Sequence, residues 1–173
     1  MTVRALCAVS LSACALACAD EPVTEIFACY SVDPALATEI GDVTLCAQTD
    51  DASRLLFGCD GSALGSLAID PFSQGYVRRR ASGVRLELAW IDAGGATVLR
   101  EAATVPFQEG RVVDVALSLD ARCRAMECGV GMTCAAGECV TERVDPACLV
   151  DHGAPRDPGC DDPRGLGCPD PSP

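Results

Sequence analysis

The sequence predicts an all-β protein, an antiparallel β-sandwich followed by a small disulfide-rich irregular module. Three observations predict this fold class. Between Val23 and Leu119, short runs of alternating apolar and polar residues are separated by turn residues at intervals of roughly ten, which is typical of a sandwich. No amphipathic stretch is long enough for a convincing helix. From Cys123 onward the hydrophobic runs cease and cysteines come every few residues, which indicates stabilisation by disulfides.

The length and composition allow one domain with a small appendage. The chain has 173 residues, of which 49% are apolar, so a modest aliphatic core is expected and wholesale disorder is disfavoured. We expect four parts: a signal peptide at 1–19, a β-sandwich domain at 20–120, a cysteine-rich knob at 121–148 and an Asp/Pro/Gly-rich tail at 149–173.

The N-terminus has the pattern of an export signal. Met1–Arg4 carries one positive charge, Ala5–Leu16 is apolar, and small residues precede the acidic Asp20. The apolar stretch is too short to span a bilayer as a permanent anchor.

Three processing outcomes compete. Leu11–Cys14 resembles the lipobox of bacterial lipoproteins, in which the thiol of Cys14 would take a diacylglyceryl group, although the segment before it is very short. Ala15–Cys18 matches that pattern less well, but it leaves an apolar segment of ordinary length and would place the lipid on Cys18. Residues 17–19 fit the A-x-A rule for ordinary signal cleavage before Asp20.

The number of cysteines bears on this choice, because an exported protein tends to leave no thiol unpaired. Of 13 cysteines, removal of Cys7, Cys14 and Cys18 leaves 10, whereas lipidation at Cys14 would leave Cys18 over. Parity therefore favours Cys18 as the lipid attachment site, or cleavage after Ala19, while the motif favours Cys14. We expect a lipoprotein of the outer membrane or cell surface, with plain secretion as the alternative.

The strands of the sandwich are predicted from alternation. The clearest is Val84–Asp92, in which every second residue is apolar and faces inward while Arg85 and Glu87 face water. Asp92–Gly95 then reads as a hairpin turn into Thr97–Arg100, because glycines tolerate positive φ. The other predicted strands, in chain order, are Thr24–Val32, Val43–Thr49, Arg54–Cys59, Leu64–Ile69, Tyr76–Arg80 and Val113–Leu119.

Three of the ten remaining cysteines, Cys29, Cys46 and Cys59, lie in the sandwich. Because three is odd, at least one must pair outside this group if all are oxidised. Cys46 is opposite in phase to the apolar residues of its strand, so we expect it on the outer face. A bond there would join the strand to another strand or to the tail.

The knob is too short to bury a core of its own, so cystines must hold it, at typically ~2 to 4 kcal/mol each. Four cysteines form the pattern C-x4-C-x2-G-x2-C-x2-G-x-C, in which Gly131 and Gly137 supply tight turns. The spacing differs from the C-x2-C pairs of structural zinc sites, so we expect no metal or other cofactor. The knob cysteines are Cys123, Cys128, Cys134 and Cys139, and the tail adds Cys148, Cys160 and Cys168.

This run, followed by Val144-Asp145-Pro146, resembles the C-terminal part of uncharacterised exported lipoproteins of myxobacteria, in which a predicted β-sandwich precedes a small cysteine-rich knob. The likeness covers Cys123–Pro146. More loosely, the run is similar to a fragment of an EGF-like module without its full six-cysteine frame. The resemblance implies an envelope location and supplies no activity.

The tail and the charged segments carry weak functional signals. The carboxylates of the tail lack a D-x-D-x-D-G calcium loop, so we expect an irregular, solvated acidic segment. His152, the one histidine, lies in a Pro/Gly-rich stretch and is expected to be an exposed loop residue. Asp60–Ser62 reads as a turn. Arg78–Arg80 is interpreted as the protection of an edge strand, with an anionic partner as the alternative. The tail carboxylates are Asp145, Asp151, Asp157, Asp161 and Asp162.

The net charge and the lack of a nucleophile motif limit the function classes. The charge of −12 becomes −13 without residues 1–19, and such a surface repels nucleic acid and anionic headgroups. We expect no nucleic-acid partner and membrane contact only through an N-terminal lipid. The sequence favours a non-enzymatic envelope lipoprotein that interacts with a protein or polysaccharide at the cell surface. The alternative is a secreted hydrolase or enzyme inhibitor that uses acidic loop residues, for instance a carboxylate pair.

Overall fold

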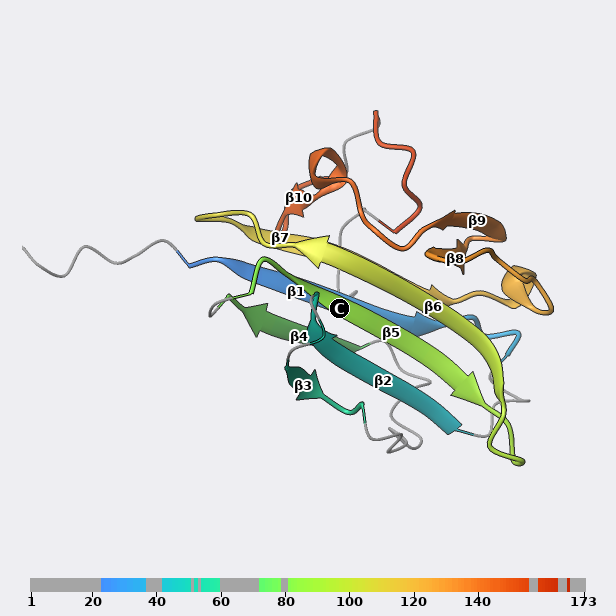
Figure 1. Cartoon of the computed structure of the whole chain (residues 1–173). Helices are drawn as coiled ribbons and strands as arrows, with labels where there is room; N and C mark the ends of the chain where they lie inside the picture. The colour runs from blue at the N-terminus through green and yellow to red at the C-terminus, as the bar shows by residue number, and fades with distance from the viewer. Residues whose placement is uncertain are drawn as a thin grey trace, which may run out of the picture.

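Two four-stranded sheets form the body of the protein (Figure 1). The computed structural model describes residues 23–36, 42–50, 52, 54–59, 72–78, 81–155, 159–164 and 168. Within this part there are two short 3₁₀ helices and no α-helix. The proposed signal and its cysteines Cys14 and Cys18, the predicted turn Asp60–Ser62 and the predicted strand Leu64–Ile69 lie outside the described residues.

The first sheet has the strand order β10-β7-β1-β4. It contains β1 (Glu25–Val32), β4 (Phe72–Val77), β7 (Val112–Leu119) and the two-residue β10 (Val150–Asp151). The central strands β1 and β7 are parallel, and the other neighbours are antiparallel. A parallel pair between strands so far apart in the chain needs a long connection, and here all of the second sheet lies between them in sequence.

The second sheet has the order β3-β2-β5-β6 and is antiparallel throughout. It contains β2 (Asp42–Thr49), β3 (Leu55–Phe57), β5 (Gly83–Ile91) and β6 (Thr97–Pro106). The β5–β6 hairpin turns at the predicted place, where the Asp92 carboxylate accepts the N–H groups of Gly94 at 2.8 Å and Ala96 at 2.9 Å. Gly95 there has φ +82°, which a residue with a Cβ rarely adopts.

The core lies between the two sheets and is built by the predicted alternation. The core residues of β1 are Ile26, Ala28, Tyr30 and Val32, and those of β5 include Val84, Leu86 and Leu88. Each large aliphatic side chain buried here contributes roughly 1.5–3 kcal/mol. The sequence-based prediction of an all-β sandwich is therefore confirmed, while the parallel pairing of β1 with β7 departs from the predicted antiparallel arrangement.

Strands β4 and β6 differ from their predicted bounds. β4 is Phe72–Val77, where Tyr76–Arg80 is predicted, and it lies at the edge of its sheet, as expected for the arginine-rich segment that follows. β6 extends to Pro106, six residues beyond its predicted end at Arg100. The extension was missed because Glu101, Ala102 and Ala103 are all buried and do not alternate. Both faces of β6 are covered there.

The knob is a two-stranded hairpin, β8 (Met132–Ala135) and β9 (Glu138–Thr141), which lies beside β6 (Figure 1). Ala136 and Gly137 connect the strands with φ +53° and +85°, the pattern of a two-residue type I′ turn. A Cβ on Gly137 would lie 3.0 Å from the Cβ of Arg122, so this turn also requires close approach. The knob is preceded by η2 (Ala121–Cys123) and followed by η3 (Pro146–Cys148).

The tail is attached to the sandwich, whereas the sequence predicts irregular solvated loops for this segment. β10 pairs with β7, and Cys168 bonds to Cys29 on the outer face of β1. Arg164 is 1% exposed, and its backbone carbonyl accepts the N–H of Ala116 on β7 at 3.1 Å. The tail therefore covers part of the β7 side of the molecule.

Candidate functional site

All ten predicted cysteines form disulfides. The bond from Cys29 to the tail confirms that at least one sandwich cysteine pairs outside its group. Cys46, half-buried on the outer face of β2 as expected, bonds to Cys59 just after β3. Such a framework fits an extracellular or secreted protein. The five pairs are Cys29–Cys168, Cys46–Cys59, Cys123–Cys134, Cys128–Cys139 and Cys148–Cys160.

The tail carboxylates within the described residues mostly stabilise the fold. Asp145 caps η3 by accepting the N–H of Ala147 at 2.9 Å. Asp151 pairs with Arg111 at 2.7 Å, and Asp162 pairs with Arg164 at 2.9 Å. Asp157 lies outside the described residues. Among the described residues, no group of three or more His, Cys, Asp or Glu side chains is arranged to hold a metal ion.

His152 has a partner that the sequence did not indicate. Its Nδ1 lies 2.7 Å from Oδ1 of Asp114, a buried carboxylate on β7, and its ring lies against Phe27 with a centroid separation of 4.4 Å. The side chain is 49% exposed, in accord with the expected loop position. This contact fixes the orientation of the imidazole and fastens the turn after β10 to the sheet.

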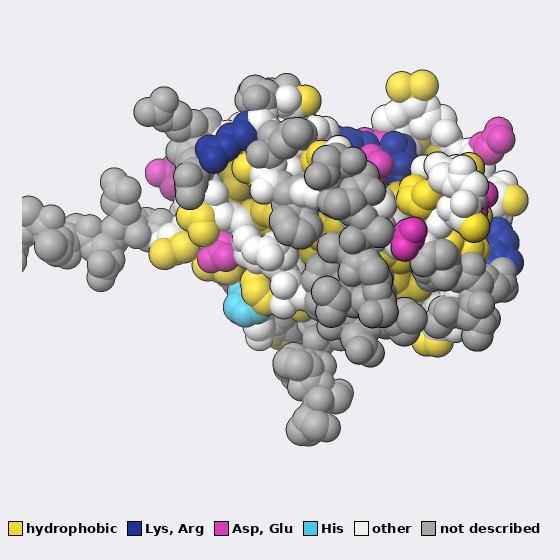
Figure 2. All heavy atoms as spheres, turned by 90° about the horizontal axis from the view of Figure 1, so that it is seen from below, with side chains coloured by type: hydrophobic (Ala, Val, Ile, Leu, Met, Phe, Trp, Pro, Cys, Tyr) yellow, Lys and Arg dark blue, Asp and Glu magenta, His cyan; other side chains and the backbone are white. Residues whose placement is uncertain are grey.

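The described surface carries mixed charges. Figure 2 shows acidic and basic side chains interspersed on the face seen from below, with no single-sign patch among those it colours. Of the predicted arginine cluster, Arg78 is exposed directly after β4, and Arg79 and Arg80 lie outside the described residues.

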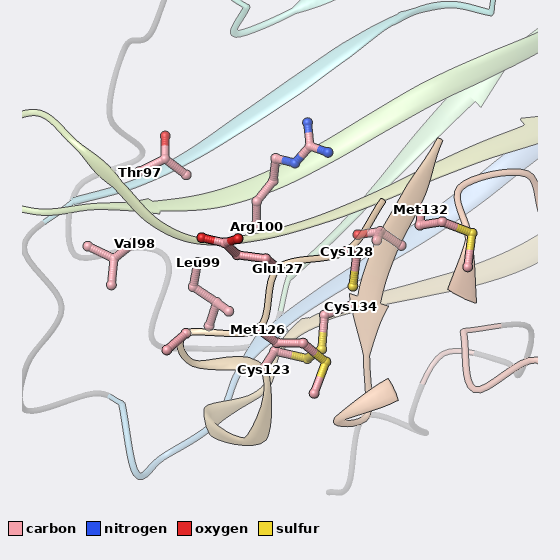
Figure 3. A pocket seen from close by; sticks show the side chains of 12 residues that line it. Thr97, Val98, Leu99, Arg100, Cys123, Met126, Glu127, Cys128, Met132 and Cys134 are labelled. Atoms are coloured by element: carbon pink, nitrogen blue, oxygen red, sulfur yellow. A yellow bond between two sulfur atoms is a disulfide. The ribbon is translucent and has the colours of Figure 1, made fainter. Parts of the chain in front are cut away.

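A groove of about 450 Å³ lies between the start of β6 and the knob (Figure 3). We call it the β6–knob groove. One wall is Thr97–Arg100 of β6, and the other is the loop 125–128 with the start of β8. Figure 3 shows Leu99 directed toward Met126, above the disulfide that joins Cys123 to Cys134.

The groove has a sulfur-rich floor, although polar surface makes up more of its whole lining than apolar surface does. Leu99 is 5% exposed and belongs to the core, while Met126 is 40% exposed and covers it from outside. Met132 lines the far end. Thioether and disulfide sulfurs are polarizable and fit surfaces of varied shape. The floor therefore suits an apolar side chain from a ligand.

The edge of β6 is only half covered by the knob. The N–H of Ala102 donates to the Thr133 hydroxyl at 2.9 Å, and the N–H of Thr104 donates to the Glu142 carbonyl at 2.7 Å. The carbonyl of Thr104 accepts the N–H of Val144 at 3.0 Å. Beyond Ala102, toward Thr97, the edge lines the groove.

Two charged side chains mark the rim. Arg100 pairs with Glu87 at 3.3 Å and with Glu142 at 3.0 Å, and Figure 3 shows its guanidinium directed away from the loop that carries Glu127. Glu127 is exposed and has no ion pair or hydrogen bond to any described residue. The local electrostatics therefore favour a cationic group at the rim.

A buried polar cluster supports the groove from behind. Glu101 on β6 is 3% exposed and accepts the N–H of Ser118 at 2.5 Å. Burial raises the pKa of Glu101 from 4.5 to about 8, although the Ser118 hydrogen bond and the charge of Arg164 both lower it. Arg164 donates to the carbonyls of Ala102 at 3.0 Å and Glu142 at 3.2 Å. The tail is thus locked to β6 next to the knob.

Sequence reasoning missed the groove, since its residues lie in a turn, a strand and the knob, and none carries a motif. The available signal was the pair of methionines, Met126 and Met132, within the cysteine loop. Comparison with protein-family models, with curated proteins and with solved structures found no match. No helix within the described residues has the length and apolar character needed to cross a membrane.

Proposed function

We propose that this protein is a non-enzymatic binding protein of the cell envelope, exported and tethered by an N-terminal lipid, with the β6–knob groove as its ligand-contacting surface. The observation that carries the proposal is the groove itself, because a preformed concavity that combines apolar side chains with a few placed polar groups is the usual form of a binding site.

The groove is rigid, which supports a binding role. Cys123–Cys134 crosslinks its floor, Cys128 bonds to Cys139, and the buried Thr133 joins the knob to β6. A preorganised site loses little conformational entropy when a ligand binds.

Envelope location is supported by the five disulfides, by the signal-like N-terminus and by the resemblance of the knob to exported lipoproteins. Labelling of cells with a radiolabelled fatty acid tests the lipid. The label should be retained in Cys14→Ala and lost in Cys18→Ala. Label lost in Cys14→Ala alone would move the attachment site to Cys14, and an unlabelled wild type would favour plain secretion.

Site-specific photo-crosslinking in intact cells tests the binding role. A photoreactive residue in place of Met126 should give adducts that are absent with the same residue in place of Val130. Val130 is the matched control because it is fully exposed on the knob and does not line the groove. Equal adduct patterns at both positions would contradict a binding role for the groove.

A hydrolase remains the second candidate, and one observation favours it. A histidine oriented through Nδ1 by a buried carboxylate is the arrangement of a base and its orienting group in many hydrolases. Assay of the wild type on ester, peptide and glycoside substrates, with His152→Ala as the comparison, tests it. Hydrolysis that is lost in the variant while the fold is retained would support an enzyme.

A further inference from the structure

We infer that the β6–knob groove binds an extended peptide segment of a partner protein, which adds as a short strand to the free edge of β6 and presents a basic side chain to Glu127. This inference rests on the proposed function and names the class of its ligand.

The outer edge of β6 has a backbone N–H and a C=O group available for a ligand at Arg100. Alternate residues of an edge strand direct both N–H and C=O away from the sheet. Ala102 and Thr104 do so, and all four of these groups bond to the knob or the tail. Arg100 precedes Ala102 by two residues in unbroken register with β5, so its N–H and C=O also point outward. Within the described part of the chain nothing bonds to them, and they face the groove.

A strand-like ligand satisfies this open pair. Peptides that add to a sheet edge gain main-chain hydrogen bonds from the edge and specificity from pockets for alternate side chains. Here the contact for one side chain is the exposed Met126, which covers the buried Leu99. The length of the open edge at Thr97–Arg100 limits the added strand to a few residues.

Charge selects the kind of peptide. Glu127 at the rim makes no ion pair with any residue of the described ranges, while Arg100 is already paired with Glu87 and Glu142. The whole chain carries a charge of −12, which attracts basic segments. The same charge opposes pairing of the β6 edge with a second copy of this chain, because like charges across an interface are unfavourable.

The test begins with selection of random linear heptapeptides on the full mature protein. Enriched peptides should combine apolar and basic residues, and the best one is synthesised for affinity measurement. Arg100→Pro is the decisive variant, because proline lacks the outward N–H yet is tolerated where an edge strand faces solvent. Arg100→Ala is its matched control, since it loses the same side chain and keeps the N–H.

Arg100→Pro should weaken binding about tenfold relative to Arg100→Ala, the scale of one lost hydrogen bond. Glu127→Gln, a substitution of an exposed residue that leaves the fold intact, should weaken it about threefold and reduce its salt dependence. Equal affinities of Arg100→Pro and Arg100→Ala for the peptide would overturn strand addition. A selection that enriches no peptide would also overturn it. So would a dimer of the free protein in analytical sedimentation. If the peptide test fails but Met126 still gives groove-specific crosslinks, the binding role of the groove is retained and only the peptide ligand is rejected.

Discussion

At the residue scale, the fold depends on polar groups whose burial is offset by specific partners. Tyr30 and Tyr76 share a hydroxyl hydrogen bond of 2.9 Å inside the core, and burial raises the pKa of both. Glu101 is buried with one backbone donor. Such groups are costly when unpaired, so each identifies a place where a single substitution has a large effect.

Glu101 should make stability depend on pH. Its folded pKa of about 8 lies above the unfolded value near 4.5, so the native state keeps a proton that the unfolded chain releases. The stabilisation is complete below pH 4.5 and is lost as the pH rises toward 8. Between pH 5 and pH 8, the free energy of unfolding of the wild type should fall by on the order of 2–4 kcal/mol more than that of Glu101→Gln. The glutamine keeps an acceptor for the N–H of Ser118.

Urea unfolding of both proteins at the two pH values measures this difference. Parallel pH profiles for the wild type and the variant would contradict the assignment of the proton to Glu101.

Arg164 should be among the most sensitive positions of the tail. Its guanidinium bonds to the carboxylate of Asp162 and to two backbone carbonyls while almost fully buried. Arg164→Ala leaves Asp162 without its partner and should cost about 3–5 kcal/mol. Arg164→Lys should recover little, because an ammonium cannot reproduce the planar fork. Thermal unfolding of the three proteins checks the order, and full recovery by lysine would contradict the role of the fork.

Among the secondary-structure elements, β6 is the strand that contacts the sandwich, the knob and the tail. One side pairs with β5, while the outer edge bonds to the knob and the tail from Ala102 onward. The sequence predicted only its first four residues, Thr97–Arg100, and these prove to be the part whose outer edge is open. Its covered part was missed because burial on both faces removes the alternation that identifies a strand.

Thr133 should govern the attachment of the knob. Its buried hydroxyl is the acceptor for the Ala102 N–H, so Thr133→Val leaves that donor buried and unpaired at a cost of about 1–3 kcal/mol. The Ala102 amide should then exchange its hydrogen faster in the native state. The control is Thr97→Val, a substitution of an exposed residue on β6, the strand that contains Ala102. Unchanged protection of Ala102 in Thr133→Val would show that the hydroxyl does not hold the knob.

At the scale of the whole molecule, disulfides join segments that pair weakly or not at all through sheets. Cys29–Cys168 spans 139 residues and fastens the tail to β1, whereas Cys128–Cys139 spans 11 within the knob. In the chain-entropy account, closure of a longer loop restricts the unfolded state more. The two bonds should therefore contribute unequally to stability.

Removal of each bond tests this expectation. The double variant Cys29→Ala with Cys168→Ala should lose about 4–5 kcal/mol, and Cys128→Ala with Cys139→Ala about 3 kcal/mol. Urea unfolding of both variants and the wild type gives the comparison. Equal losses would contradict the entropic account. Mass spectrometry of unreduced digests of the wild type should recover the five pairs, and free thiols in the knob would contradict the framework.

The all-β architecture and the disulfide framework could both be predicted from the sequence. The alternation of apolar and polar residues at Val84–Asp92 and in the other strands is a local pattern of the sequence. The spacing of the knob cysteines with Gly131 and Gly137 is also local, so both features can be recognised along the chain. The odd cysteine count in the sandwich even required a bond to another segment.

The contacts between distant segments could not be predicted and are seen only in the folded chain. The groove needs Leu99 and Met126, the locked tail needs Arg164 near Ala102, and the oriented imidazole needs Asp114 opposite His152. None of these pairs is joined by periodicity or by a motif. The physical reason is that burial and pairing of polar groups depend on the whole packed chain, whereas the strand pattern depends only on neighbouring residues.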